Sequence, residues 1–360
     1  MKDRVRVGMV GTSWWADAMH LPSLKSHPRA DVVAIAGRDP LPANAMAQKY
    51  AIPQVFADYQ TMIKQAGLDA LVVSVPDDLH YPIVMDALDA GLHVLCEKPL
   101  AMDAAQAKAM YERAEDAGVC HMTYFTWRWR PQIQYVHQLI EQGFVGQLRH
   151  CQLSQIGGYA RGPQYRWRFD ARRANGVLGD LGSHVFDMSR WFAGEIMRVN
   201  ARLATVVKRS GPGPEPLQAA NDLASLTVEF ESGAQGILQV SAVAVLGHEL
   251  HVALDGTAGS LLLDYGAGGS AIQGFRAGDA QFQPLPLPAE LWGAANPAEP
   301  FEIFLKQSAG PRAFIDAILA GRPATPTFYD GWRAQCVIDA AIESDRTGCW
   351  VDVAPKGKQG

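Results

Sequence analysis

Near its amino terminus the chain reads Val7-Gly8-Met9-Val10-Gly11-Thr12-Ser13-Trp14-Trp15-Ala16. The apolar residues of 4–10 predict a buried strand, and the glycine after them predicts a tight turn into a helix. Gly11, Ser13 and Ala16 approximate the spacing Gly-x-Gly-x-x-Gly/Ala, which places a pyrophosphate at the free N–H groups of a helix start. Ser13 departs from this pattern where the backbone must approach the phosphates, although its hydroxyl can donate to a phosphate oxygen. The stretch therefore predicts a dinucleotide-binding turn.

Strands and helices go on alternating as far as residue 123. The first helix is expected to run to about Lys25. Apolar runs that predict strands follow at 31–37, 54–56, 70–75, 94–96 and 119–122, with helical patterns around 43–50, 58–66, 80–90 and 103–117 between them. This alternation predicts right-handed βαβ units and a parallel sheet. We expect residues 1–123 to form an α/β dinucleotide-binding domain.

The pattern changes after residue 123. Alternating apolar and polar residues predict strands at 147–157, 199–208, 223–230, 235–243, 249–254 and 259–264, and helical patterns lie near 131–142, 181–193, 302–320 and 330–345. Short glycine-containing turns such as 231–233 are typical of antiparallel hairpins. The stretch 265–300 is expected to be mostly irregular. Residues 124–360 therefore predict an α+β domain with one large antiparallel or mixed sheet.

Composition narrows the class of protein. A chain of 360 residues is long enough for two domains, and its formal net charge of −5 argues against nucleic acid or an anionic membrane as a partner. Five cysteines are scattered without metal-type or paired spacing, which suits reduced thiols in a cytoplasm. No apolar run reaches the length of a signal peptide core or a membrane span. We expect a soluble cytoplasmic protein without a metal site.

A second informative stretch reads Leu92-His93-Val94-Leu95-Cys96-Glu97-Lys98-Pro99-Leu100. An apolar strand runs directly into Lys98, and Pro99 favours an extended conformation for the lysine before it. Ligands of open parallel sheets bind outside the carboxyl ends of the strands. Lys98 is therefore a candidate catalytic residue, and the alternative is a surface ion pair next to a turn.

The end of the second strand bears on the choice of dinucleotide. The ribose-binding residue is expected there, and the sequence reads Ala36-Gly37-Arg38-Asp39. Arg38 can pair with a 2′-phosphate, which slightly favours NADP. Asp39 can still reach the ribose hydroxyls, so NAD remains open, and Arg38 can equally be an ordinary surface arginine.

A third stretch, 176–187, places acidic and imidazole groups on one helix. Leu181, Val185 and Met188 share a face that can be buried, while Asp180 and His184 lie on the adjacent face. A carboxylate beside an imidazole fixes its tautomer and favours proton uptake, as a general base requires. The alternative is a capping aspartate and a core histidine. A metal site is poorly supported because a closed ligand shell is missing.

Taken together, 7–15, 90–100 and 179–187 make the chain resemble the glucose–fructose oxidoreductase/inositol dehydrogenase (Gfo/Idh/MocA) family along nearly its whole length. The resemblance implies a Rossmann domain over 1–123 and a nicotinamide cofactor. For 124–360 it implies a substrate-binding and oligomerisation domain with an open, mostly antiparallel sheet. It also implies homo-oligomers, dimers or tetramers, that pair through the exposed sheet face.

The resemblance also implies roles for single residues. Lys98 lies beside the nicotinamide and the reacting hydroxyl, Asp180 lies in the substrate site, and His184 accepts the proton. His80 matches a loop on the cofactor side, although capping the following helix is an equal alternative. Arg128 and the pair Trp167 and Arg168 match positions that line the cofactor–substrate cleft. The expected cofactor contacts are Gly11, Thr12, Ser13, Trp14, Trp15, Arg38, Ser74, Pro76, His80, Glu97, Lys98, Trp167 and Arg168, and the expected substrate contacts are Lys98, Arg128, Asp180 and His184.

Two aromatic-basic clusters, 127–131 and 165–169, would also suit single-stranded nucleic acid, but the acidic net charge argues against it. Their flat faces and guanidinium groups suit a sugar with many hydroxyls. The sequence therefore predicts an NAD(P)-dependent dehydrogenase that oxidises a secondary alcohol of a sugar, cyclitol or sugar derivative. The alternatives are a redox-neutral glycosidase, epimerase or dehydratase of the same fold, and a non-catalytic dinucleotide sensor.

Overall fold

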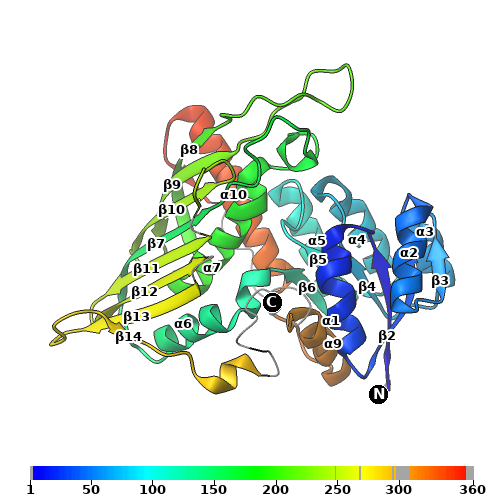
Figure 1. Ribbon diagram of the computed structural model, residues 1–360, viewed down its shortest axis with the longest axis horizontal. Coiled ribbons are helices and arrows are strands. Elements are labelled where there is room, and N and C mark those ends of the chain that lie inside the picture. Colours follow the sequence, from blue (N-terminus) through cyan, green and yellow to red (C-terminus); the bar gives the residue numbers. More distant parts are fainter. Residues whose placement is uncertain (1–2, 248, 267–268, 294–295, 297–307, 354–360) are drawn as a thin grey trace. The chain divides into compact units, whose positions relative to one another are not determined.

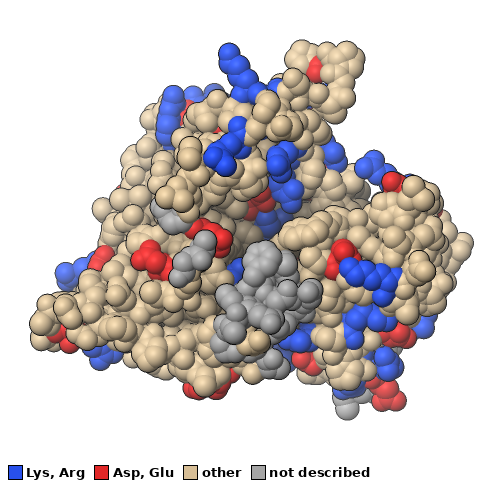
Figure 2. All heavy atoms as spheres, in the orientation of Figure 1, with Lys and Arg blue, Asp and Glu red and all other residues tan. Residues whose placement is uncertain are grey.

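The computed structural model describes residues 3–247, 249–266, 269–293, 296 and 308–353. The chain divides into two compact units (Figure 1). The first unit combines 1–129 with 294–332, and the second combines 130–293 with 333–360. Acidic and basic side chains are interspersed over the face drawn in Figure 2.

A six-stranded parallel sheet forms the centre of the first unit. Its strands are β1 (Val5–Val10), β2 (Ala30–Ala36), β3 (Gln54–Phe56), β4 (Ala70–Val73), β5 (His93–Glu97) and β6 (His121–Tyr124), in the order β3-β2-β1-β4-β5-β6. Apart from the edge strand β3, whose residues are half-buried or exposed, the apolar runs that predicted these strands are buried, as in a sheet covered on both faces. The order reverses between β1 and β4, and ligands of such sheets bind beside that point. The predicted Rossmann sheet is confirmed.

Helices connect these strands. They are α1 (Leu21–Ser26), α2 (Pro40–Tyr50), α3 (Tyr59–Gln65), α4 (His80–Asp89) and α5 (Ala104–Ala117), with the 3-10 turn η2 (Asp77–Leu79) before α4. Asp39, Asp58 and Asp103 accept backbone N–H groups at the starts of α2, α3 and α5, as N-cap residues do. The first helix differs from prediction because it begins as a π-helical turn, η1 (Ala16–His20).

A distant part of the chain completes the first unit. Helix α9 (Gly310–Ala320) packs against β1, β5 and β6, and Ser23 donates to the Ser308 carbonyl at 2.7 Å. A Cβ at Gly310 would lie 2.3 Å from the Tyr124 ring, so only glycine allows this approach. The sequence placed this helix in the 124–360 domain, whereas its contacts lie in the first unit. The predicted start of the helix, 302–307, lies outside the described residues.

The second unit is built on a nine-stranded sheet. Its strands are β7 (Leu148–Ile156), β8 (Ile196–Ala204), β9 (Leu223–Phe230), β10 (Gln235–Ser241), β11 (Leu250–Gly256), β12 (Gly259–Gly266), β13 (Gly269–Arg276), β14 (Gln283–Pro284) and β15 (Val351–Asp352), in the order β14-β13-β12-β11-β7-β10-β9-β8-β15. The pair β7–β10 is parallel and the other pairs are antiparallel. The predicted open, mostly antiparallel sheet is confirmed. Strands β13 and β14 replace part of the irregular stretch expected at 265–300.

The remaining helical elements belong partly to the first unit and partly to the second. The helical elements are η3 (Thr126–Trp129) and the first turn of α10 in the first unit, and α6 (Pro131–Glu141), η4 (Trp167–Phe169), η5 (Leu178–Gly182), α7 (Ser183–Ala193), η6 (Ala289–Trp292) and the rest of α10 (Phe328–Thr347) in the second. Helix α7 packs on β7 and β10. Alternate residues of β9 and β10, among them Thr227, Ile237 and Gln239, are exposed on the other face.

Candidate active site

The turn after β1 has the backbone that the sequence predicted. Gly11 has a φ of +111°, a conformation that strongly favours glycine. A Cβ there would lie 2.0 Å from the Ser74 carbonyl oxygen, directly after β4. At Gly37, after β2, a Cβ would lie 2.6 Å from the Thr12 methyl group. The carboxyl ends of β1, β2 and β4 therefore meet at this turn. Because Gly11 and Gly37 lack side chains, the backbone of the turn stays open to a phosphate-bearing ligand.

The helix start after the turn is organised by Ser13. Its hydroxyl accepts the Ala16 N–H at 3.2 Å and lies 3.5 Å from the Ser74 hydroxyl. Ser13 and Trp14 are exposed, so the first turn of the helix faces solvent. These residues fit the pyrophosphate of a dinucleotide, because a helix start offers N–H groups and a positive dipole end.

The two candidates for ribose binding differ in the structure. Arg38 follows β2 and is exposed. Asp39 accepts the Leu41 N–H at 3.0 Å and thereby caps α2. One carboxylate oxygen of Asp39 is therefore engaged in the fold, while the Arg38 side chain reaches the surface.

Lys98 directly follows β5 and is half-buried. Its backbone N–H donates to the Glu97 carboxylate at 3.3 Å. Glu97 is buried and also accepts from Trp15 Nε1 at 2.6 Å, with His20 Nε2 at 2.7 Å from the same oxygen. Burial raises the pKa of Glu97, but the hydrogen bond and charge of His20 and the charge of Lys98 outweigh it and hold the pKa below its usual range.

Glu97 and Trp15 were expected at the cofactor. In the structure the indole N–H of Trp15 donates to Glu97 inside the first unit, and a contact of either residue with a cofactor stays a prediction. Burying a charged carboxylate without partners is costly, which explains why polar groups converge on Glu97. His20 was not predicted, because its partner is distant in the sequence.

A second histidine, His80, contacts the residue that follows Lys98. His80 is fully buried, with Nδ1 2.9 Å from the Pro99 carbonyl and Nε2 3.0 Å from the Val75 carbonyl. Burial lowers the pKa of His80, although both carbonyls oppose this shift. Both ring nitrogens of His80 thus face backbone carbonyls, and the expected contact of His80 with the cofactor stays a prediction. Ser74 and the half-exposed Pro76 follow the carboxyl end of β4, and their expected contact with the cofactor stays a prediction.

Arg128 lies in η3 and is buried. Its guanidinium pairs with Asp330 at 3.1 Å, and Asp330 also accepts the Thr327 N–H at 2.8 Å. The predicted substrate residue thus anchors the start of α10 in the first unit.

The second unit holds the predicted acid–base pair. Asp180 accepts the Tyr159 hydroxyl at 2.5 Å and pairs with Arg168 Nε at 3.2 Å. The Arg168 guanidinium also stacks over Trp167, 4.4 Å from the ring centre. Desolvation and the charge of Asp180 raise the pKa of Tyr159 well above its usual value. Arg168 thus pairs with the aspartate and Trp167 lies under the Arg168 guanidinium, while the expected contacts of both residues with the cofactor stay predictions.

His184 lies in the first turn of α7 and is buried. Asp180 precedes it in η5, a π-helical turn that the sequence did not predict. Such turns occur often at functional sites. Tyr159 was also missed by the sequence, since it lies in a loop without a recognisable motif.

The predicted residues thus form two groups. The first unit holds Gly11, Thr12, Ser13, Trp14, Trp15, Arg38, Ser74, Pro76, His80, Glu97, Lys98 and Arg128, and the second holds Trp167, Arg168, Asp180 and His184. Within the described ranges, no cluster of three or more His, Cys, Asp or Glu residues could hold a metal ion. In the part of the chain that the structure describes, no helix is long and apolar enough to span a membrane.

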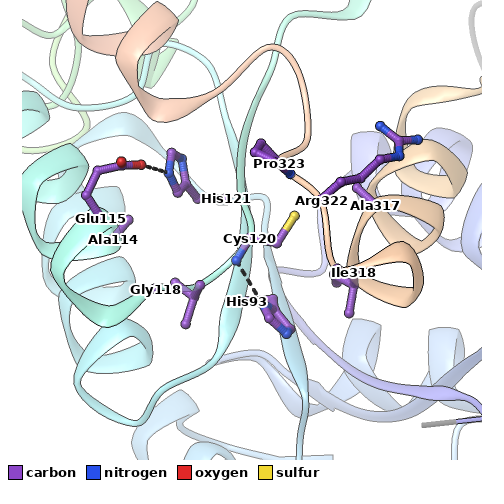
Figure 3. Close-up of a pocket in the computed structure, with 12 residues that line it drawn as sticks. His93, Ala114, Glu115, Gly118, Cys120, His121, Ala317, Ile318, Arg322 and Pro323 are labelled. Carbon is purple, nitrogen blue, oxygen red and sulfur yellow. Dashed lines mark hydrogen bonds and ion pairs between the residues drawn. The ribbon is translucent and has the colours of Figure 1, made fainter. Parts of the chain in front are cut away.

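A separate cavity of about 300 Å³ lies at the amino ends of β5 and β6 (Figure 3). His121 reaches Glu115 at 2.7 Å beside it, and the Cys120 N–H donates to His93 at 2.9 Å. Burial raises the pKa of the Cys120 thiol to about 11. The dinucleotide turn follows the carboxyl end of β1, so this cavity lies at the opposite edge of the parallel sheet. Its described lining includes none of the predicted site residues.

Comparison with known proteins adds a family context. Residues 5–125 match the oxidoreductase family with an NAD-binding Rossmann fold, and 133–262 match the GFO/IDH/MocA C-terminal domain. Levoglucosan dehydrogenase of Pseudarthrobacter phenanthrenivorans is 28% identical over 349 residues, covering 89% of this chain and 88% of that protein. Inositol 2-dehydrogenase of Rhizobium meliloti is 26% identical over 343 residues, covering 94% and 96%.

Solved structures show the same architecture. Levoglucosan dehydrogenase in complex with NADH and levoglucosan aligns with a TM-score of 0.86 at 26% identity, covering 98% of this chain and 100% of that chain. Matches that cover both halves of the chain therefore link these halves to one family.

Proposed function

This chain belongs to the Gfo/Idh/MocA family of NAD-binding oxidoreductases, and from that premise we propose that it oxidises a secondary alcohol of a sugar or cyclitol. The observation that carries the proposal is Lys98, fixed at the carboxyl end of β5 on the same sheet edge as the glycine turn after β1. The names of the relatives support the substrate class, because they are dehydrogenases of levoglucosan, apiose, xylose and inositol.

The residues take the following roles in the proposed reaction. A bound nicotinamide supplies the hydride acceptor. The Lys98 ammonium donates to the reacting hydroxyl oxygen and stabilises the negative charge that develops there. His184 accepts the hydroxyl proton, and Asp180 orients the imidazole.

Cofactor contacts follow from the first unit. We propose that the turn 11–15 receives the pyrophosphate and that Ser74 and Pro76 border the site. Arg38 is exposed and Asp39 caps α2, which supports a slight preference for NADP over NAD. The comparisons include an NADP-dependent relative and NADH-bound structures, so both dinucleotides belong in the test.

We also propose that copies of the chain associate through the open face of the sheet of the second unit. The exposed Ile237 of β10 supports an apolar contact there. The five cysteines are unpaired in the structure, which supports action in the cytoplasm.

The test is the near-ultraviolet absorbance of NAD⁺ and of NADP⁺ mixed with the protein and levoglucosan, D-apiose, D-xylose or myo-inositol. We expect steady formation of reduced nicotinamide with at least one of them, and the faster dinucleotide identifies the preference. Conversion of a sugar without accumulation of reduced nicotinamide would instead show a redox-neutral enzyme. Tight dinucleotide binding without any conversion across a wider sugar panel would contradict the proposal.

A further inference from the structure

The loop between β7 and η5 carries an excess of positive charge. Five arginines lie between positions 161 and 173, and Asp170 is the one acidic residue of that stretch. The whole chain has a formal net charge of −5, so this excess is local. Two of the arginines are paired, because Arg172 lies 3.0 Å from Asp170 and Arg168 lies 3.2 Å from Asp180.

Two other arginines of the loop differ from these. Arg161 and Arg166 are exposed, and neither pairs with a carboxylate among the residues that the structure describes. Exposed arginines elsewhere in this unit do form such pairs, as Arg202 does with Asp345 at 3.2 Å. The charges of Arg161 and Arg166 are therefore available to a ligand that carries a negative charge.

Both arginines lie beside Tyr159, whose hydroxyl donates to Asp180. Arg161 Nε donates to the carbonyl of Gly158 at 3.1 Å, directly before the tyrosine. Desolvation and the charge of Asp180 raise the pKa of the Tyr159 hydroxyl, whereas nearby positive charges, that of Arg166 among them, lower it. The Arg166 guanidinium therefore lies near this hydroxyl, close to the aspartate that we place in the substrate site.

Buried contacts fix the loop in place. Phe169 is buried, and the Arg209 guanidinium lies over its ring, 4.2 Å from the ring centre. Arg209 pairs with Asp222 at 3.0 Å, and these two side chains are 1% and 0% exposed. Arg209 also donates to the carbonyl of Ala160. The loop is therefore anchored on both sides of 161–166, which lowers the cost of ordering its side chains around a ligand.

We propose that Arg161 and Arg166 bind an anionic group of the substrate, so that this chain prefers a sugar with a carboxylate or a phosphate over a neutral sugar. A guanidinium group binds both anions well, because its N–H donors match their oxygens in pairs. Neutral sugars remain substrates but bind more weakly, since they lack this contact. The inference rests on the proposed function and narrows the substrate class of the same site.

The experiment measures binding and needs no turnover. Calorimetry of the full-length protein at low ionic strength, with NADH present, gives dissociation constants for D-glucuronate, D-glucose 6-phosphate and D-glucose. We expect at least one charged sugar to bind about tenfold or more tighter than D-glucose, because charge-assisted hydrogen bonds add to its affinity. The tighter of the two charged sugars distinguishes a carboxylate from a phosphate. Failure of both charged sugars to bind tighter than D-glucose would overturn the proposal.

Substitution of the two arginines tests where the charged sugar binds. In Arg161→Gln/Arg166→Gln, which removes two charges and retains polar side chains, we expect the preference over D-glucose to fall about fivefold or more. The matched control is Arg149→Gln/Arg276→Gln, which removes two exposed arginines from β7 and β13 of the same unit and should leave the preference unchanged. An unchanged preference in the first variant, or an equal fall in the control, would overturn the proposal.

The affinity for NADH separates this role from cofactor binding. Its dissociation constant should be the same in the wild type and in Arg161→Gln/Arg166→Gln. Weaker NADH binding in the variant would show that these arginines contact the dinucleotide, and it would overturn the proposal.

The wild type supplies a second measurement, which decides if the variant does not fold in thermal melting. Salt screens exposed charges, so the affinity for the charged sugar should fall as KCl is added while that for D-glucose stays constant. Equal behaviour of the two sugars would overturn the proposal. Because only binding is measured, a failure of every sugar to yield reduced nicotinamide would contradict the proposed function without altering these outcomes.

Discussion

Lys98 in the first unit and Asp180 in the second are held in opposite ways. Lys98 follows a buried strand, and its neighbours Glu97 and Pro99 are fixed by the buried His20 and His80. Asp180 is held by two side chains from the loop region between β7 and η5: Tyr159, which is 39% exposed, and Arg168, whose side chain is 42% exposed.

The difference indicates a division of labour in the proposed enzyme. Buried hydrogen bonds on both sides of Lys98 leave its backbone little freedom, so we expect the lysine to keep its position with every substrate. Exposed side chains on loops change rotamer at small cost, so we expect the surroundings of the aspartate to adapt to the substrate. We therefore expect variants near Lys98 to lower turnover in general, and variants near Asp180 to change substrate preference.

The largest effect is expected at the lysine itself. Lys98→Ala should lower kcat by about 10²–10⁴-fold while dinucleotide binding is retained, because charge stabilisation at the reacting oxygen is lost. Absorbance assays for turnover and energy transfer from tryptophan to NADH for binding check this. Lys49→Ala, which removes a surface cation paired with Asp17, is the control and should leave kcat unchanged. Near-normal turnover in Lys98→Ala would contradict the proposed role of Lys98 and, with it, the contrast between the two units.

The next effect concerns the rigidity of the first unit. Gly11→Ala should weaken dinucleotide binding and lower the free energy of unfolding by more than the ~1–2 kcal/mol that a positive φ costs alone, because its Cβ would lie 2.0 Å from the Ser74 oxygen. Gly91→Ala is the matched control, since Gly91 also has a positive φ of 72° but a Cβ there would meet no atom within 4 Å. Denaturant titration and NADH titration measure both. Equal losses in the two variants would argue against a crowded turn.

A smaller effect is expected around Asp180. Tyr159→Phe removes one hydrogen bond to the carboxylate, and we expect kcat/KM to fall about tenfold with the preferred sugar. Arg168→Met should act in the same direction, since it removes the ion pair but keeps the length of the side chain. Tyr165→Phe, in the same loop, removes a hydroxyl that lies 3.4 Å from Asp170 and serves as the control. Losses of the size expected for Lys98→Ala would show that Asp180 is held as rigidly as the lysine.

The smallest effect is expected at the exposed edge of the first unit. Arg38→Ser should lower the ratio of kcat/KM for NADP⁺ to that for NAD⁺ about fivefold, because an exposed ion pair with a 2′-phosphate contributes about 1 kcal/mol. An unchanged ratio would mean that Arg38 does not contact the dinucleotide.

Much of this arrangement could be predicted from local sequence. Except for the short edge strand β3, the strands of the first unit are predictable because buried parallel strands are continuous apolar runs. The glycine turn is predictable because its conformation limits the residue type. Strand β13 was missed because it contains three glycines or small residues at its start and, of its described side chains, few that are buried. Strand β13 is stabilised by its pairing with β12, and the periodicity of a single segment does not report such pairing.

Some residues of the candidate site were not predicted for the same reason, because they depend on contacts between distant parts of the chain. His20 and Tyr159 meet Glu97 and Asp180 across 77 and 21 positions of the chain, so no short motif links them. The two π-helical turns η1 and η5 were also missed, because an apolar stripe of α-helical spacing does not reveal one widened turn. Long-range packing determines these features, and local patterns do not encode it.

The contrast between the two units is tested most directly by substrate preference. The measurement is the ratio of kcat/KM for two accepted sugars in the wild type, in His20→Leu and in Tyr159→Phe. We predict that His20→Leu lowers both values and leaves the ratio unchanged, whereas Tyr159→Phe changes the ratio. A changed ratio in His20→Leu together with an unchanged ratio in Tyr159→Phe would contradict the proposed division of labour.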